Sequence, residues 1–135
     1  MSVIEPALAD IGHDARVVVT TRGRVPAAMV EYAGEKVARV RRYTPEPIRA
    51  AHVVLTLERD PARERPAVAE AELEVDGTHV RAQAETPTLR ETVDLLADRL
   101  QEALVRHRDR TRTRRRSRAR QAKLAARDVT TATEG

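Results

Sequence analysis

The stretch "AVAEAELEVDGTHVRAQA", residues 67–84, decides the fold. Apolar side chains occupy every second position of its first half, at Ala67, Ala69, Ala71, Leu73 and Val75. This two-residue period is typical of a half-buried strand, and the intervening positions are mostly glutamate. Asp76-Gly77 is a dipeptide that two-residue hairpin turns favour, and the alternation resumes after it over residues 78–84. The stretch therefore predicts an antiparallel hairpin with one apolar face and one polar face.

Two more strands and a helix are predicted before this hairpin. "RVVVTT" (16–21) and "AAHVVLTLER" (50–59) are rich in β-branched residues and read as strands. Between them, "PAAMVEYAGEKVARVRRY" (26–43) has helical periodicity. Its apolar stripe comprises Met29, Ala33, Val37 and Val40. The prolines of the following "TPEP" end this helix, because proline and the residue before it both disfavour continuation.

A second amphipathic helix is predicted after the hairpin, in "TPTLRETVDLLADRLQEALVRHRDR" (86–110). Its apolar stripe comprises Leu89, Val93, Leu96, Leu100 and Leu104. Either Thr86 or Thr88 can cap it, and Thr88 followed by Glu91 has the spacing of a capping box. The element order β-α-β-β-β-α indicates an α+β fold: one four-stranded sheet with two helices on one face.

Positive charge is concentrated at the C-terminal end of the chain. Residues 1–105 hold 14 Lys and Arg against 18 Asp and Glu, a net charge of −4, whereas residues 106–135 hold 11 against 3, a net charge of +8. A charge split of this kind indicates an interaction segment for a polyanion. We expect three parts: a flexible arm (1–15), an α+β domain (16–110) and an arginine-rich, disordered tail (111–135).

Basic residues also lie beside both apolar stripes. One flank of the first helix carries Tyr32, Lys36, Arg39 and Tyr43, and one flank of the second carries Arg99, Arg106 and Arg110. These flanks can contact a polyanion, or they can be solvated edges of the core. The two tyrosines likewise can stack on bases or close the edge of the core.

Other classes of function find little support in the residues. The four histidines, His13, His52, His79 and His107, form no metal-ligand spacing, and no glycine-rich phosphate loop is present. The only serines, Ser2 and Ser117, lie in segments expected to be loose. We therefore expect no enzyme, no metal and no cofactor. The chain has no cysteine, no apolar run long enough for a membrane helix and no signal-peptide pattern, so we expect a cytoplasmic protein without a membrane partner.

Four stretches in order give the chain a family resemblance: "MVEYAGEKVARVRRY" (29–43), "HVVLTLE" (52–58), "AEAELEVDGTHVRAQAE" (69–85) and "TVDLLADRLQEALVRHRDR" (92–110). The chain resembles the ribosome hibernation-promoting factor and ribosome-associated inhibitor family, also called sigma-54 modulation proteins. The resemblance covers about residues 16–110. It implies a fold similar to the double-stranded RNA-binding domain.

The resemblance also implies a partner and a site. The partner is the small ribosomal subunit, bound through its ribosomal RNA in the channel for messenger and transfer RNA, which blocks translation and preserves idle ribosomes. Carried over by position, the RNA-binding residues are Lys36, Arg39, Arg99, Arg106, Arg108 and Arg110. We expect the tail to extend this contact through Arg112, Arg114, Arg115 and Arg116. No small-molecule substrate is expected, and the protein is expected to be a monomer off the ribosome.

Two features depart from the family pattern. Long members carry a second domain that pairs two ribosomes, and residues 111–135 predict no such domain, so the chain resembles the short form. The body is acidic overall, which is unusual for an RNA-binding protein. A general module for structured RNA or DNA, with a basic tail, therefore stays open as the alternative.

Overall fold

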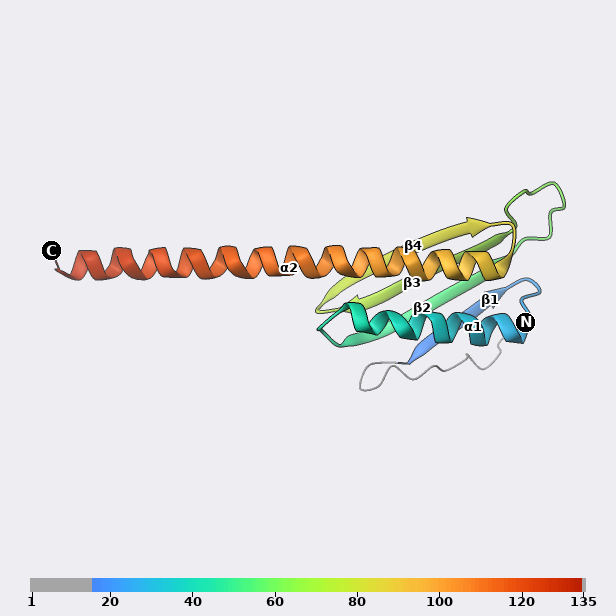
Figure 1. Cartoon of the computed structure of the whole chain (residues 1–135), viewed down its shortest axis with the longest axis horizontal. Helices are drawn as coiled ribbons and strands as arrows, with labels where there is room; N and C mark the ends of the chain where they lie inside the picture. Colours follow the sequence, from blue (N-terminus) through green and yellow to red (C-terminus); the bar gives the residue numbers. More distant parts are fainter. Residues whose placement is uncertain (1–15, 135) are drawn as a thin grey trace. The chain divides into compact units, whose positions relative to one another are not determined.

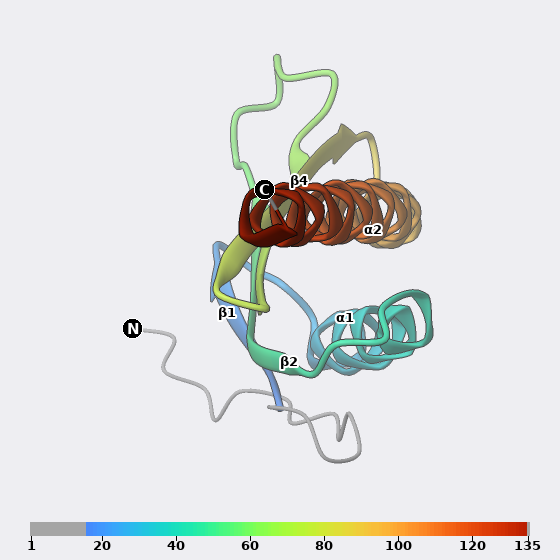
Figure 2. The ribbon, with the colours of Figure 1, turned by 90° about the vertical axis from the view of Figure 1, so that its left-hand side faces the viewer.

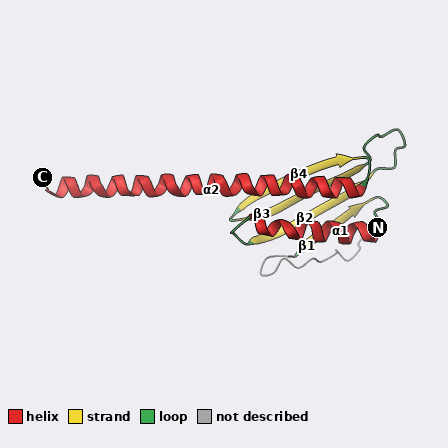
Figure 3. Ribbon diagram, in the orientation of Figure 1, coloured by secondary structure: helices red, strands yellow, loops and turns green. Residues whose placement is uncertain are grey.

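The computed structural model describes residues 16–134, with side chains to residue 126. The elements are β1 (Val17–Arg22), α1 (Ala27–Ala38), the 3₁₀ helix η1 (Arg39–Tyr43), β2 (Ile48–Leu57), β3 (Ala67–Val75), β4 (Thr78–Thr86) and α2 (Leu89–Glu134) (Figures 1 and 3). The predicted α+β class and element order are confirmed. The predicted arm, residues 1–15, lies outside the described residues.

The four strands form one sheet in the order β1-β2-β3-β4. β1 pairs with β2 in parallel, while β2–β3 and β3–β4 are antiparallel. The predicted hairpin is confirmed in register, with Val75 opposite Thr78 across the turn. Asp76 (φ 53°) and Gly77 (φ 72°) both adopt positive φ. A type I′ turn needs that conformation at both central positions, which explains the Asp-Gly dipeptide.

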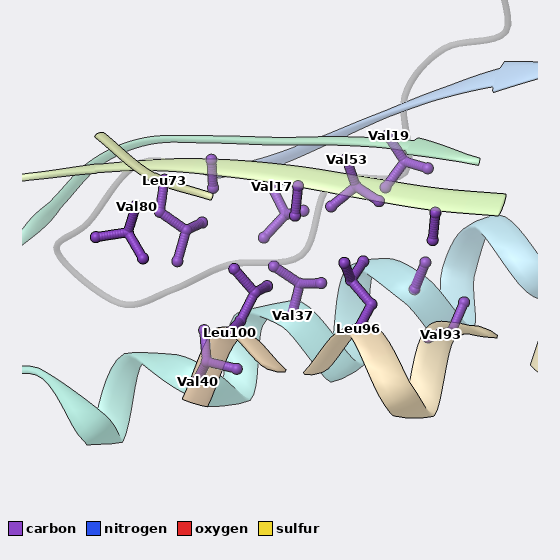
Figure 4. Packing of buried hydrophobic residues seen from close by; sticks show 14 of the residues in the cluster. Val17, Val19, Val37, Val40, Val53, Leu73, Val80, Val93, Leu96 and Leu100 are labelled. Atoms are coloured by element: carbon purple, nitrogen blue, oxygen red, sulfur yellow. The ribbon is translucent and has the colours of Figure 1, made fainter. Parts of the chain in front are cut away.

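The hydrophobic core lies between one face of the sheet and the two helices (Figures 2 and 4). The sheet contributes Val17, Val19, Val53, Leu73 and Val80, and the helical side contributes Val37, Val40, Val93, Leu96 and Leu100 (Figure 4). The stripe predicted for the second helix is buried throughout, from Leu89 to Leu104. In the first helix, Val30 is buried in addition to the predicted stripe, of which Met29 is only half-buried.

The start of α2 is fixed by threonines. The Glu91 amide donates to Thr88 Oγ1 at 3.3 Å, so Thr88 is the residue that caps the helix. Thr92 is fully buried and donates to the carbonyl oxygen of Ala67 on β3 at 3.1 Å. Thr86, the other predicted cap, instead hydrogen-bonds the Thr88 carbonyl at 2.6 Å. These bonds tie the beginning of α2 to the β3–β4 side of the sheet.

The first helix differs from its prediction at its C-terminal end. The sequence predicts one α-helix to residue 43, whereas α1 ends at Ala38 and η1 follows over Arg39–Tyr43. A 3₁₀ helix turns by about 120° per residue rather than 100°, so side chains after Ala38 leave the predicted flank.

The C-terminal segment also differs from its prediction. We expected a disordered tail over residues 111–135, whereas α2 extends to Glu134. Residues 89–134 contain neither glycine nor proline and are rich in alanine and arginine, two strong helix formers. The chain divides into two compact units between Val105 and Arg106, where the arginine run begins, rather than after residue 110.

Candidate nucleic-acid interface

Asp94 organises a polar cluster that joins α1 to α2. The Tyr32 hydroxyl on α1 donates a hydrogen bond to Asp94 Oδ1 on α2. Lys36 Nζ lies 3.4 Å from the same oxygen, so the predicted RNA-binding lysine is already in an ion pair. The hydrogen bond to Asp94 raises the pKa of Tyr32, and desolvation adds to the increase. Tyr32 thus closes the edge of the core, as one of the two open interpretations predicted.

Arg90 adds a second cation to this cluster. Its guanidinium lies 4.7 Å from the centroid of the Tyr32 ring, and Lys36 Nζ lies 5.8 Å from the same centroid. Lys36 and Arg90 therefore both lie beside the Tyr32 ring, and of the two only Lys36 forms a recorded ion pair with Asp94. Arg90 was not among the predicted residues, because helical periodicity places it on the same flank of α2 as Asp94, away from the basic flank with Arg99.

The end of the first helix carries a second group of cations. Arg39, Arg41 and Arg42 are all exposed within η1. The Arg42 guanidinium lies 5.1 Å from the Tyr43 ring centroid, which orients this side chain. Only Arg39 of the three was predicted. The run "RVRRY" was the available signal for the others, but a helical wheel at 100° per residue misplaces residues in a 3₁₀ turn.

Arg99 lies on the opposite flank of α2 from Asp94. Its Nη1 donates to the backbone carbonyl oxygen of Gln83 on β4 at 2.6 Å. The exposed ridge of α2 between these two flanks is acidic and includes Glu91, Asp98 and Glu102. This acidic ridge separates Arg99 from the flank of α2 that carries Asp94, the ion-pair partner of Lys36.

The arginine run, Arg106–Arg116, belongs to the second unit. Arg106 and Arg110 are exposed, as are Arg112, Arg114, Arg115 and Arg116. Arg108 is half-buried, and its Nε lies 3.6 Å from Asp109 Oδ1 without a hydrogen bond. Arginines spaced two apart in an α-helix point about 200° apart, so this segment presents positive charge all round its axis. Such a segment can approach a polyanion from any side.

Comparison with known proteins identifies the family. The sequence pattern of the family described as "Sigma 54 modulation protein / S30EA ribosomal protein" matches residues 17–112. The chain belongs to this family. A relative named ribosome hibernation promoting factor, from Azotobacter vinelandii, is 33% identical over 86 residues, which cover 64% of this chain and 75% of the relative. The resemblance recognised in the sequence is thereby confirmed.

Solved structures support the S30EA family fold. The N-terminal domain of Protein Y from Thermus thermophilus is 30% identical, with a TM-score of 0.55 over 67% of this chain and 94% of that domain. A ribosomal subunit interface protein from Coxiella burnetii, 22% identical with a TM-score of 0.56 over 67% of this chain and 94% of that one, shares the fold. Likeness to the double-stranded RNA-binding domain stays a prediction.

Neither a membrane span nor a metal cluster is found in the part of the chain that the structure describes. None of its described helices is both long and apolar enough to cross a bilayer. The described His, Asp and Glu side chains form no group of three or more that could hold a metal ion.

Proposed function

We propose that this S30EA family member is a ribosome hibernation factor. It binds ribosomal RNA of the small subunit in the channel for messenger and transfer RNA, and so holds idle ribosomes inactive. It acts in the cytoplasm, as a monomer before it binds, and it catalyses no reaction. Family membership and the name of the Azotobacter vinelandii relative support the ribosome as its partner.

The observation that supports the RNA contact is the position of the exposed or half-buried cations on the helical side of the first unit. Arg39, Arg41 and Arg42 project from η1, and Lys36 and Arg90 flank the seam between α1 and α2. Phosphate contacts from Lys and Arg supply most of the affinity of nucleic-acid-binding proteins. The sheet face on the other side carries glutamates, which phosphate would repel.

The two units have different roles in this proposal. The helical side of the first unit sets the position on the RNA, since contacts with Asp94, Tyr43 and Tyr32 hold Lys36, Arg42 and Arg90 in place. The arginine run supplies further phosphate contacts, which do not depend on the base sequence of the RNA. A spare donor remains on Arg99 after its bond to Gln83, because a guanidinium has five N–H groups.

Sedimentation with isolated small subunits at about 0.15 M salt, followed by chemical probing of the bound RNA, tests the proposal. We expect stoichiometric binding and protection confined to the channel that holds messenger and transfer RNA. The alternative, a general nucleic-acid module, predicts equal affinity for unrelated RNA hairpins and DNA duplexes and protection scattered over the subunit. That result would refute the proposed function.

A further inference from the structure

Within the first unit, the sheet has an open face on the side away from α1 and the first turns of α2 (Figure 2). We use the term open face for the side of β2, β3 and β4 that carries His52, Val54, Glu70, Glu72, Arg81 and Gln83. These residues line a hollow of about 580 Å³. This surface lies opposite the helical side, and the proposed RNA contact does not use it.

Most charged groups around the hollow are already paired within the face. Glu72 Oε1 accepts a hydrogen bond from Arg81 Nε at 2.7 Å, and His79 Nδ1 lies 3.3 Å from the same oxygen. The bond to Arg81 lowers the pKa of Glu72. His52 Nε2 is joined to Thr20 Oγ1 at 2.8 Å. Glu72 and His52 therefore hold their positions without a ligand.

Glu70 is the exception. It is exposed and forms no ion pair or hydrogen bond with any side chain in residues 16–126. The strand register places it directly between Val54 on β2 and Gln83 on β4. The hollow thus combines one uncompensated carboxylate, one side-chain amide and the apolar surface of the half-buried Val54.

We propose that the open face binds an extended, basic protein segment, with an arginine or lysine side chain seated in the hollow. Long cationic side chains lay an aliphatic stem on apolar surface and keep the charged head at a polar rim. Here the stem would cover Val54, and the head would reach the Glu70 carboxylate and the Gln83 amide oxygen.

The charge of the open face selects a polypeptide over a nucleic acid. This side of β3 and β4 carries Glu70, Glu72, Glu74 and Glu85 against Arg81, and the neighbouring strand β1 adds Arg22, so acidic groups still outnumber basic ones. Phosphate would be repelled there, whereas a basic segment is complementary to it. The inference goes beyond the proposed function, because RNA on the helical side and a basic protein segment on the open face can bind together.

The probe is a fluorescently labelled peptide of six arginine–valine pairs. Its binding to the full chain is measured by fluorescence anisotropy at about 0.15 M salt. Glu70→Gln keeps the shape of the side chain and removes its charge. We expect this variant to bind the peptide about fivefold more weakly, the effect of a well-placed exposed ion pair. The matched control is Glu31→Gln, the same change at an exposed position of α1, which should leave the affinity unchanged.

Several outcomes would overturn the inference. Equal weakening in both variants would mean general charge attraction, and no measurable binding by the unaltered chain would remove the site altogether. Tighter binding of an RNA hairpin by Glu70→Gln, with peptide binding unaffected, would mean that nucleic acid occupies this face. Melting temperatures establish that both variants fold, and sedimentation with small subunits, which Glu70→Gln should not affect, tests the proposed function separately.

Discussion

Arg99 Nη1 donates a hydrogen bond of 2.6 Å to the carbonyl oxygen of Gln83, so a predicted RNA-binding residue satisfies a backbone group of β4, an edge strand of the sheet. Edge strands leave backbone donors and acceptors open to pairing with other chains. The Arg99 side chain donates a hydrogen bond to one of these acceptors, and this bond links α2 to β4. Arg99 therefore has a structural role whether or not it also contacts RNA.

The first prediction separates this role from RNA binding. Arg99→Met keeps the aliphatic stem and removes the hydrogen bond, which should lower the free energy of unfolding by about 1 kcal/mol. The exposed side chain of Arg39 forms no hydrogen bond or ion pair within residues 16–126, so Arg39→Met should change this free energy by less than about 0.5 kcal/mol. Urea denaturation of both variants measures the difference. Equal stabilities would mean that the bond to Gln83 contributes nothing.

The second prediction concerns η1. Charge reversal of Arg39 and Arg42 to Glu should abolish inhibition of cell-free translation, because repulsion replaces attraction at each phosphate contact. The melting temperature should change little, since both side chains are exposed. The matched control is reversal of Glu74 and Glu85 to Lys on the other side of the sheet, which should leave inhibition intact. If the control variant loses inhibition and the η1 variant keeps it, the binding side is the reverse of the one proposed.

The sequence predicted the fold well because the decisive signals are local. The alternation over 67–75, the Asp76-Gly77 turn and the Thr88 cap each depend on a few neighbouring residues, and all are confirmed. The boundary between α1 and η1 was missed, because the change from α to 3₁₀ geometry leaves no periodic signal over five residues.

The arrangement of the site could be predicted only in part. Lys36 lies on α1, as predicted, whereas Arg39 lies in the 3₁₀ helix η1 rather than in an α-helix. The partners of the cations depend instead on contacts between distant parts of the chain. Asp94 lies 58 residues after Lys36 in the sequence, and their ion pair forms only because α2 packs beside α1. The same packing brings Arg90 onto the Tyr32 ring, which no spacing rule indicates.

The third prediction follows from the raised pKa of Tyr32, caused first by its hydrogen bond to Asp94. Below the ordinary tyrosine pKa of about 10 the phenol is protonated in both the folded and the unfolded chain, and the stabilisation is complete. Above it the unfolded chain ionises first, so stability falls until the folded pKa is passed. In a Tyr43→Phe variant, Tyr32 is the only tyrosine, and its absorbance titration should have a midpoint above 10.

The control for this titration is Asp94→Asn in the Tyr43→Phe background. It removes the carboxylate that holds the phenol proton, so the midpoint should move back toward the ordinary value. A midpoint unchanged by Asp94→Asn would show that the hydrogen bond between Tyr32 and Asp94 is absent in solution. Asp94→Asn also removes the ion-pair partner of Lys36, and a higher affinity for RNA would show that this lysine has become available.

The last prediction concerns the arginine segment. Truncation after Arg110 removes Arg112, Arg114, Arg115, Arg116, Arg118, Arg120, Lys123 and Arg127. If the full chain makes about 6–10 phosphate contacts, its affinity for the small subunit should fall by about 10³–10⁵-fold between 50 and 200 mM salt. The truncated chain should bind more weakly and show a smaller slope, because fewer counterions are released. Its pattern of RNA protection should nevertheless be unchanged, since charge spread all round a helix carries no positional information. Filter binding over a salt series and chemical probing measure the two effects separately, and a truncated chain that protects a different region of RNA would show that the segment directs binding.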